Sequence, residues 1–449
     1  MKVAIIGAGS YTWSLGFVRQ FVHSENLSDL TLAMMDINPE RLKTLSTAAR
    51  IYNKCHSSPI RIEDMQNLDA ALDGSDFVIV CISTGGLEAM RFDIEIPEKY
   101  GIWHTVGDTV GPGGWSRATR NIPVFNDLAA RMKRYCPDAW LINVTNPLTV
   151  LTRLPQRDYG IKTIGMCPGV EEQARAMASA VGIRKENIEL SFRVAGIDHC
   201  SYFLDLFANG IDVLNKLKEI GCFRNDNLLS KQIKTDDPMA QGVMNNIIFM
   251  LWYNLGYLPA ISDRHAVENY PQFQVSKSGN LPYGVERTNI AQRQTRLDKC
   301  QALIEDYIKS QDDKSLGALG HGDDPVVQVI ESLSGKRTFL WCSNYMNIGQ
   351  LPGFPEGAVV ETRCMFDKAG VHPLCSKMPD ILKPIVLPHV LRQENSIDII
   401  LHGTFKELVA LIMTDPMCCQ LSPHECRQMV RELLEANKSF IKNPELLEF

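Results

Sequence analysis

The first 36 residues constrain the fold of this chain more than any other stretch. An apolar run at residues 2–6 leads into the turn Gly7-Ala-Gly9-Ser10-Tyr11-Thr12, an amphipathic helical pattern to about Val22, and a second apolar run at 30–35 that ends in Asp36. Strand, tight turn, helix and strand in this order form the opening unit of a parallel, doubly wound sheet. The sequence therefore predicts an α/β fold.

The turn after the first strand has the composition of a dinucleotide-binding loop. Gly7 permits a tight turn, Gly9 lets the backbone approach a pyrophosphate, and Asp36 can accept hydrogen bonds from ribose hydroxyls, which favours NAD over NADP. Thr12 stands where the fingerprint usually has its third glycine, so the motif depends on its strand and helix context. A purely structural turn is the alternative.

Two further apolar runs, at residues 75–82 and 139–144, are typical of buried parallel strands. Ser83 follows the first run and Thr145-Asn146-Pro147 follows the second, where an open sheet presents its ligand-binding edge. We expect these residues to touch a cofactor or substrate, with ordinary turn chemistry as the alternative. The candidate cofactor-binding residues are Gly7, Gly9, Ser10, Tyr11, Asp36, Arg41, Ser83, Asn143 and Thr145.

The segment 106–115 contains five glycine or proline residues and is followed by a helix that carries Arg117 and Arg120. A loop so rich in glycine is costly without a use. Arginine forks bind carboxylates and phosphates through two parallel hydrogen bonds, so the segment is a candidate substrate loop. A flexible surface loop with solvated arginines is the alternative.

The run Thr163–Val170 indicates a strand that ends at Cys167, with Pro168 at the first helical position and two acidic residues in the first turn. A cysteine at the positive end of a helix is favoured as a thiolate, and so as a metal ligand or nucleophile. A buried cysteine that only packs is the alternative. His199, after a predicted strand at about 190–195, could meet Cys167 at one metal ion, unless it is a satisfied core or cap residue.

An acid, a cation and a base stand next to one another at Asp263, Arg264 and His265. This makes Asp263 and His265 candidate catalytic residues for acid/base chemistry. Charged triples on solvated loops are common, and such a loop is the alternative.

The length of 449 residues favours two domains. We expect an NAD-binding, Rossmann-like domain at residues 1–195, similar to that of lactate and malate dehydrogenases, and a mixed α+β catalytic domain at 196–449. Helical patterns at about 215–255, 297–310 and 396–441 make the second domain partly helical, and we expect it to carry the contacts of a homodimer or homotetramer.

Charge and cysteine content limit the partners and the compartment. The net charge of −6 offers no basic surface to nucleic acid or to an anionic membrane. Thirteen cysteines without the spacing of a small disulfide scaffold, in a chain that opens on a strand, lead us to expect free thiols, no signal peptide and a cytoplasmic location.

Taken together, the motifs resemble glycoside hydrolase family 4 over nearly the whole chain. The motifs that carry the resemblance are Gly7-Ala-Gly9-Ser10, Met35-Asp36-Ile-Asn-Pro-Glu-Arg41, Thr145-Asn146-Pro147, Cys167, Gly196-Ile-Asp-His199, Gly357-Ala-Val-Val-Glu-Thr and Phe366-Asp-Lys-Ala-Gly-Val-His-Pro. The loop 107–114 with its two arginines, and the triple at 263–265, are most similar to the α-galacturonidase-type branch.

This resemblance implies an α-glycosidase for an α-galacturonide or a related acidic sugar, with NAD and a divalent metal, usually manganese, as cofactors. In that family the sugar is oxidised at C3, C2 is deprotonated, the C1 substituent is eliminated, water adds, and the hydride is returned. The resemblance also implies Cys167 and His199 as metal ligands and Asp263 as the acid/base residue. It leaves Asn146, Arg117, Arg120 and Arg264 as substrate residues.

Two positions depart from the family pattern. Members without a preference for a 6-phosphate usually carry histidine after the metal cysteine, whereas this chain has Pro168, whose side chain offers no donor or acceptor. Asp198 stands where asparagine is usual. The alternative functions are an NAD-dependent 2-hydroxy acid dehydrogenase of the lactate or malate type, which would need no metal cysteine, and a non-catalytic NAD-binding sensor.

Overall fold

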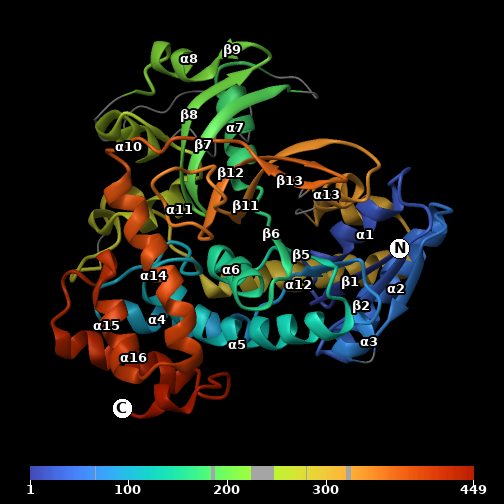
Figure 1. Ribbon diagram of the computed structural model, residues 1–449, viewed down its shortest axis with the longest axis horizontal. Helices are drawn as coiled ribbons and strands as arrows, with labels where there is room; N and C mark the ends of the chain where they lie inside the picture. The colour runs from blue at the N-terminus through green and yellow to red at the C-terminus, as the bar shows by residue number, and fades with distance from the viewer. Residues whose placement is uncertain (66, 184–187, 224–246, 280, 320–324) are drawn as a thin grey trace.

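The computed structural model describes residues 1–65, 67–183, 188–223, 247–279, 281–319 and 325–449, and its strands join into one mixed sheet (Figure 1). Along the main path the strands are β10 (Leu258–Pro259), β8 (Cys200–Ala208), β7 (Leu190–Ile197), β12 (Val359–Asp367), β11 (Phe339–Met346), β6 (Lys162–Gly165), β5 (Trp140–Asn143), β4 (Phe77–Val80), β1 (Lys2–Ile6), β2 (Thr31–Met35) and β3 (Arg61–Asp64). Off this path, β13 (Gly370–Pro373) pairs with β12, and β9 (Ile211–Asp212) pairs with β8.

The strands from β3 to β6 are parallel and lie in the order 3-2-1-4-5-6. This is the strand order of a doubly wound dinucleotide-binding fold. The predicted Rossmann-like α/β fold is therefore confirmed. The strands predicted at 2–6, 30–35, 75–82 and 139–144 correspond to β1, β2, β4 and β5.

Helices cover both faces of this parallel part. Val3 and Ile5 of β1 belong to the apolar core beneath α1 and α2, whereas Ala4 and Ile6 belong to the core beneath α5 and α6. Successive side chains of a strand point to opposite faces, so β1 contributes to both cores. The helices of this half are α1 (Ser14–Val22), α2 (Pro39–Cys55), α3 (Leu68–Leu72), α4 (Gly86–Glu98), α5 (Gly111–Tyr135), α6 (Leu148–Tyr159) and α7 (Gly169–Ala180).

Helix α5 begins at Gly111, inside the segment that we expected to be a loop up to Trp115. A Cβ at Gly113 would lie 2.9 Å from the carbonyl oxygens of Asp93 and Gly107, and a Cβ at Gly114 would overlap the backbone of Thr109. The glycines therefore let the first turn of α5 pack directly against neighbouring backbone. They serve a buried helix start, and the extended loop prediction was wrong.

A row of four residues joins the parallel part of the sheet to the antiparallel part. Gly165 of β6 pairs with Asn344 of β11, which pairs with Glu361 of β12, which in turn pairs with Gly196 of β7. Within the row, the Nδ2 of Asn344 donates to the Oε1 of Glu361 at 3.0 Å. Glycine at both ends fits the close approach, because a Cβ at Gly165 would lie 2.6 Å from the Oγ1 of Thr152 and a Cβ at Gly196 would overlap β8.

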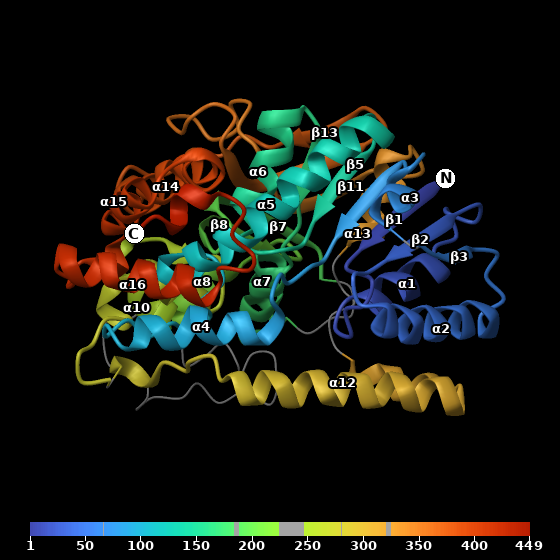
Figure 2. The same ribbon diagram turned by 90° about the horizontal axis from the view of Figure 1, so that it is seen from below.

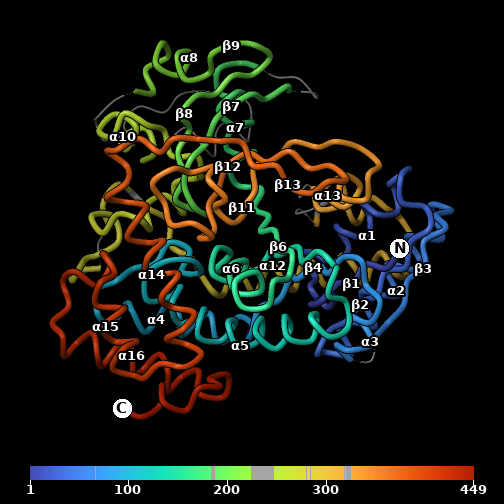
Figure 3. Tube along the Cα trace, in the orientation of Figure 1, coloured from blue at the N-terminus to red at the C-terminus, as the bar shows by residue number. Residues whose placement is uncertain are grey.

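Helices from later in the chain pack in two places. α12 (Ile290–Ser310) lies against α2, where the rings of Tyr307 and Tyr52 have centroids 6.2 Å apart (Figure 2). Near the C-terminus, α14 (Lys383–His402), α15 (Phe405–Met413) and α16 (Pro423–Ala436) form a cluster on the side away from the N-terminus (Figure 3). The remaining helices of the described part include α8 (Val213–Glu219), α10 (Ile247–Leu255), α11 (Asp263–Ala266) and α13 (Val326–Leu333).

The predicted helical stretches correspond only in part to single helices. The stretch at 396–441 is divided among α14, α15 and α16, and residues 224–246 of the stretch at 215–255 lie outside the described residues. The division at residue 195 falls within β7 and stays a proposal. Within the described ranges, no helix combines the length and the apolar composition needed to cross a lipid bilayer.

Replacing Gly7 by alanine should destabilise the fold more than the same change at Gly160. Both residues have positive φ, at +91° and +68°, which costs alanine about 1–3 kcal/mol. Only at Gly7 would the added Cβ also meet backbone, at 2.5 Å from the carbonyl oxygen of Cys81, because Gly160 has open space around it. Urea unfolding of Gly7→Ala and Gly160→Ala measures the difference, and equal losses of unfolding free energy would contradict it.

Candidate functional site

The turn after β1 admits backbone but not side chains. A Cβ at Gly9 would lie 2.8 Å from the carboxylate carbon of Asp36, whose Oδ2 accepts the Gly9 N–H at 2.8 Å. In the described part of the chain, the N–H groups of Tyr11 and Thr12 have no backbone acceptor. A bare turn with available N–H groups just before α1 fits the pyrophosphate of a dinucleotide, and the carboxylate beside it fits a ribose.

The other predicted cofactor residues surround this turn. The guanidinium of Arg41 lies 5.4 Å from the ring centroid of the buried Tyr11, and the hydroxyls of Ser10 and Thr12 are 3.3 Å apart. Ser83 is exposed just after β4. Their contacts with a cofactor stay predictions.

Asn143 and Thr145 hold the ends of β4 and β5 together. The Oδ1 of Asn143 accepts the Thr145 N–H at 2.8 Å, and the Nδ2 of Asn143 donates to the Oγ1 of Thr152 at 3.2 Å. The Oγ1 of Thr145 donates to the carbonyl of Val80 at 3.2 Å and accepts the Ile82 N–H at 3.0 Å. Both side chains are buried, so they shape the sheet edge, and a direct contact with cofactor stays a prediction.

The structure brings Cys167 and His199 together. Cys167 lies between β6 and α7, and its Sγ accepts the Gly169 N–H at 3.4 Å. Helix α7 begins at Gly169, so Pro168 is the residue before the helix and not its first residue as predicted. His199 stands in the two-residue turn between β7 and β8, and its Nε2 is 3.7 Å from the Sγ of Cys167.

Hydrogen bonds select the tautomer of His199. The hydroxyl of Thr109 donates to the Oδ1 of Asp108 at 2.8 Å, so it must accept from the Nδ1 of His199, also at 2.8 Å. Nδ1 therefore carries a proton, and in the neutral form of His199 the lone pair on Nε2 faces Cys167. Metal-binding histidines are commonly fixed in this way by a hydrogen bond from their other nitrogen.

Asp198 lies beside this pair with only 1% of its surface exposed. Its Oδ2 is 3.7 Å from the Nδ1 of His199, and among the described residues neither carboxylate oxygen meets the geometry of a hydrogen bond, although the Cys167 thiol beside it favours the ionised form. Burial raises the pKa of Asp198. One donor atom each from Cys167, Asp198 and His199 lie within 4.8 Å of one another, and the same holds for Asp108, His199 and His265. Thiolate, imidazole and carboxylate are ligands of divalent metals, so these residues fit a metal ion.

The two predicted catalytic residues point to different places. The carboxylate of Asp263 accepts the N–H groups of Ile247 and Ile248, the first described residues of α10, at 2.9 and 3.0 Å, and burial raises its pKa to about 7. The ring of His265 packs on that of His199 with centroids 3.9 Å apart. Burial, and next the charge of His199, lower the pKa of His265 well below its ordinary range, so the ring is neutral and can accept a proton. Of these two residues, only His265 belongs to one of the two groups of possible metal ligands, the one with Asp108 and His199.

Arg117 and Asn146 also border this group. The Nε of Arg117 donates to the carbonyl of Asn146 at 3.0 Å, and the Nδ2 of Asn146 donates to the Oδ2 of Asp108 at 3.3 Å. Burial alone would raise the pKa of Asp108, but the charges of His199 and Arg117 lower it below the ordinary range. Asp108 is therefore an ionised carboxylate.

The other two predicted substrate arginines have protein partners. The Nη2 of Arg264 donates to the carbonyl of Thr105 at 2.6 Å and to the Oγ1 of Thr288 at 2.9 Å. In place of the predicted substrate contact, Arg120 forms a buried ion pair with both carboxylate oxygens of Asp93 at 2.7 Å. Its guanidinium is 1% exposed, a setting that suits a structural pair between α4 and α5.

Glu268 organises the segment that carries Asp108. Its Oε1 accepts the N–H groups of Val106 and Gly107 at 2.9 and 2.8 Å and lies 3.1 Å from the Nδ1 of His104. The Nε2 of His104 in turn accepts the Gly113 N–H at 3.1 Å. These bonds fix the approach of the segment to the start of α5.

Sequence reasoning did not assign roles to Asp108, Thr109 and Glu268. A signal existed for the first two, since they stand among the glycines of a segment already chosen as a substrate loop. For Glu268 the sequence contained no such signal, because its partner His104 is 164 positions away.

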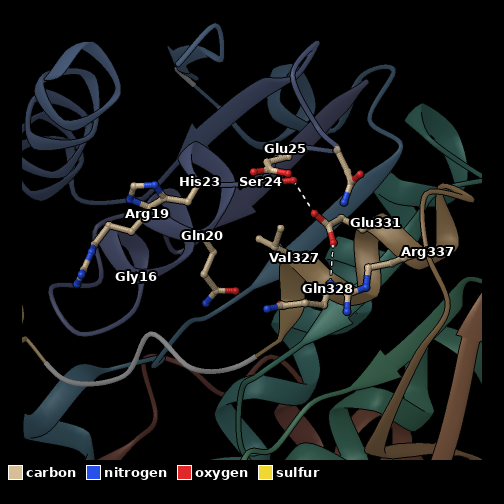
Figure 4. A pocket seen from close by; sticks show the side chains of 11 residues that line it. Gly16, Arg19, Gln20, His23, Ser24, Glu25, Val327, Gln328, Glu331 and Arg337 are labelled. Carbon is tan, nitrogen blue, oxygen red and sulfur yellow. Dashed lines mark hydrogen bonds and ion pairs between the residues drawn. The ribbon is translucent and has the colours of Figure 1, made fainter. Parts of the chain in front are cut away.

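A hollow between α1 and α13 lies apart from these residues (Figure 4). Glu331 stands in it, accepting the Ser24 hydroxyl at 2.6 Å and facing the Nη1 of Arg337 at 3.4 Å. The residues that line it include none of the predicted site residues.

Comparison with known proteins gives full-length matches. The profile described as family 4 glycosyl hydrolase matches residues 2–183, and that of the family 4 glycosyl hydrolase C-terminal domain matches residues 194–418. An alpha-galacturonidase of Thermoanaerobacterium saccharolyticum is 30% identical over 466 residues, covering 98% of this chain and 96% of that protein.

Two solved structures have the same fold. The lplD protein of Bacillus subtilis is 26% identical with a TM-score of 0.85, over 97% of this chain and 99% of that one. A 6-phospho-alpha-glucosidase from gut microorganisms, in complex with NAD and Mn²⁺, is 18% identical with a TM-score of 0.79, over 98% of this chain and 99% of that one. At the second identity the likeness extends to the fold alone.

The carboxyl of Glu361 should make stability depend on pH. Burial, and next the charge of Asp198, raise its pKa from 4.5 to about 8, so the folded protein keeps a proton that the unfolded chain releases. The resulting stabilisation is complete at acid pH and is lost as pH rises through about 8. Urea unfolding of metal-free protein from about pH 5 to about pH 9 should show a steeper decline for the wild type than for Glu361→Gln, and parallel curves would contradict this.

Proposed function

The chain belongs to family 4 of the glycosyl hydrolases, and we propose that within this family it cleaves α-linked galacturonides or closely related acidic α-glycosides. The dehydrogenase alternative is not favoured, since both family profiles match and together span most of the chain. The observation that carries the proposal is the half-buried Arg117 near Asp108, whose carboxylate lies within 4.8 Å of the ring nitrogens of His199 and His265. The full-length similarity to an alpha-galacturonidase supports the same substrate class.

The proposed cofactors are NAD and a divalent metal, with manganese the first choice. Both fit the residues present: Gly9 and Asp36 leave a bare turn for a dinucleotide, and Cys167, His199 and the buried Asp198 offer metal donors. When bound, these groups supply reversible oxidation at C3 and polarisation of the sugar O2 and O3, which makes the C2 proton acidic. The similar structure with NAD and Mn²⁺ supports this choice.

The residue that we propose to remove the C2 proton is His265. A neutral imidazole is a competent base, and the ring of His265 lies against His199, within the group of Asp108, His199 and His265. Asp263 remains the second candidate, because its raised pKa of about 7 also suits proton transfer. Its two hydrogen bonds to α10 favour a role in holding α11 to α10, which positions His265.

The carboxylate of a uronic acid requires a cation whose hydrogen-bond donors are not all used by the protein. Arg117 donates its Nε to a backbone carbonyl, which leaves the two terminal nitrogens of its fork for a substrate oxygen pair. Arg264 and Asn146 border the same region as further substrate residues. Arg120 is proposed only as support, through its pair with Asp93 beneath α5.

We also propose a cytoplasmic enzyme that works as a homodimer or homotetramer, without a nucleic acid or membrane partner. All thirteen cysteines lie within the described residues and none forms a disulfide there, which suits a reducing compartment. The net charge of −6 disfavours polyanionic partners.

Hydrolysis should require both cofactors and an acidic sugar. A chromogenic α-galacturonide should be cleaved with NAD and Mn²⁺ under reducing conditions, and the matching α-galactoside at least about 30-fold less efficiently in kcat/KM, since a charge-assisted contact is worth about 2 kcal/mol. Arg117→Gln should lose most of this preference and leave galactoside turnover unchanged. Turnover that survives both chelation and NAD removal would refute the proposed mechanism.

The proton-transfer step can be followed by isotope exchange. In D₂O the product should carry deuterium at C2, and His265→Asn should lower both this exchange and kcat by about 10²–10⁴-fold, the usual effect of losing a general base. Asp263→Asn should retain exchange while lowering the melting temperature. The reverse pattern, with exchange lost only in Asp263→Asn, would make Asp263 the base, and hydrolysis without deuterium at C2 would exclude elimination.

A further inference from the structure

We propose that Asp198 is a third protein ligand of the divalent metal, together with Cys167 and His199. This inference rests on the proposed function, since it takes the metal to lie at the Cys167–His199 pair. It concerns the carboxylate directly before His199 in the turn between β7 and β8. The ligand set would then consist of one thiolate, one imidazole and one carboxylate.

The backbone holds the three donors in a fixed relation. Asp198 and His199 are the whole turn between β7 and β8, because Ile197 pairs directly with Cys200. A turn of two residues between paired strands has little freedom, so one metal ion can meet both side chains only where the turn presents them. Cys167 reaches the same place from β6, with all three donor atoms within 4.8 Å of one another.

Three carboxyl groups near the site, of which Asp198 and Glu361 are buried and Asp108 is half-buried, differ in their hydrogen bonds. Asp108 is bonded to Thr109 and to Asn146. Glu361 accepts the Ser201 hydroxyl at 2.7 Å and the Asn344 amide at 3.0 Å.

Asp198 differs from the other two: within the part of the chain that the structure describes, neither of its oxygens meets the geometry of a hydrogen bond, and its polar neighbours are the Cys167 thiol and the His199 ring of the same cluster. It is 1% exposed, so water does not substitute for a partner. A buried carboxylate in this condition is costly, and a bound cation removes the cost. Asp108 and Glu361 show that the other two carboxyl groups of this region do have hydrogen-bond partners.

The ligand set also has a definite charge. A thiolate and a carboxylate together neutralise a divalent ion, whereas an asparagine at residue 198 would leave one positive charge. Carboxylate oxygen is a ligand type that manganese favours, while thiolate favours softer metals. Asp198 therefore makes this site tighter for manganese than a site with only Cys167 and His199.

The test compares Asp198→Asn with Glu361→Gln in the full-length protein, using Mn²⁺ alone without NAD or sugar. Titration calorimetry should show the Kd for Mn²⁺ rising at least about tenfold in Asp198→Asn, since even outer-shell changes cost 10–100-fold. Glu361→Gln, a change of the same kind at a buried carboxyl with two partners, should keep the wild-type Kd. The melting temperature of metal-free Asp198→Asn should equal or exceed that of the wild type, because an unpaired buried carboxylate is removed.

Three results would overturn the inference. The first is a wild-type Kd in Asp198→Asn, and the second is a large fall in its metal-free melting temperature, which would indicate a structural role. The third uses the wild type alone, should the variant fail to fold: an anomalous map of Mn²⁺-soaked crystals should place an Asp198 oxygen at about 2.0–2.2 Å from the ion, and a larger separation would overturn it.

A further variant separates this inference from the proposed function. If Cys167→Ser abolishes Mn²⁺ binding while Asp198→Asn does not, the inference fails and the metal site stands. If Cys167→Ser binds Mn²⁺ as the wild type does, the proposed metal site fails, and the inference fails with it.

Discussion

The row of residues that joins the two parts of the sheet determines where the site residues of this protein lie. Gly165 and Gly196 stand at the two ends of a four-residue row across β6, β11, β12 and β7, with the hydrogen-bonded side chains of Asn344 and Glu361 between them. A Cβ at Gly165 would lie 3.0 Å from the Cβ of Asn344, so glycine permits the close approach of β6 to β11, while Gly196 permits that of β7 to β8. The row joins a parallel, nucleotide-binding sheet to an antiparallel one. Cys167 lies two residues beyond one of its ends.

The chemistry of the site follows from that joint. The β7–β8 turn places Asp198 and His199 next to Cys167. The Sγ of Cys167 and the Nε2 of His199 are then 3.7 Å apart. The segment before α5 then adds the Thr109 hydroxyl, which fixes the tautomer of His199. The side chains that form the site therefore come from three separate parts of the chain, and each part is held by its own backbone hydrogen bonds. Such a site is preorganised, because little of it must move to receive an ion.

Pro168 can be understood within this arrangement. Its ring offers neither a donor nor an acceptor, yet the Cys167 thiol still accepts a backbone N–H at the start of α7, from Gly169. The imidazole next to the Cys167–His199 pair comes from α11, where His265 packs on His199. The acid/base role that we propose for His265 therefore does not depend on residue 168.

The sequence by itself determined the parts of the protein that depend on near neighbours. Periods of two and of about 3.6 residues define strands and helices locally, so β1, β2, β4 and β5 were predictable, as was the bare turn at Gly9. The strand predicted to end at Cys167 is present as β6, but it ends two residues earlier, at Gly165. Sheet topology also made a meeting of Cys167 and His199 a reasonable expectation. What sequence patterns cannot contain is the choice of partner between residues far apart in the chain.

Only the tertiary structure decided those partners. In the folded protein, Arg120 forms an ion pair with Asp93, and Asp263 accepts hydrogen bonds from α10. Asp198 is buried, and among the described residues its oxygens meet the geometry of no hydrogen bond. The physical reason is that the role of a polar side chain depends on which groups surround it once water is removed. That surrounding is set by packing between distant segments. The sequence predicted which chemical groups are present, and the fold assigned each of them its neighbours.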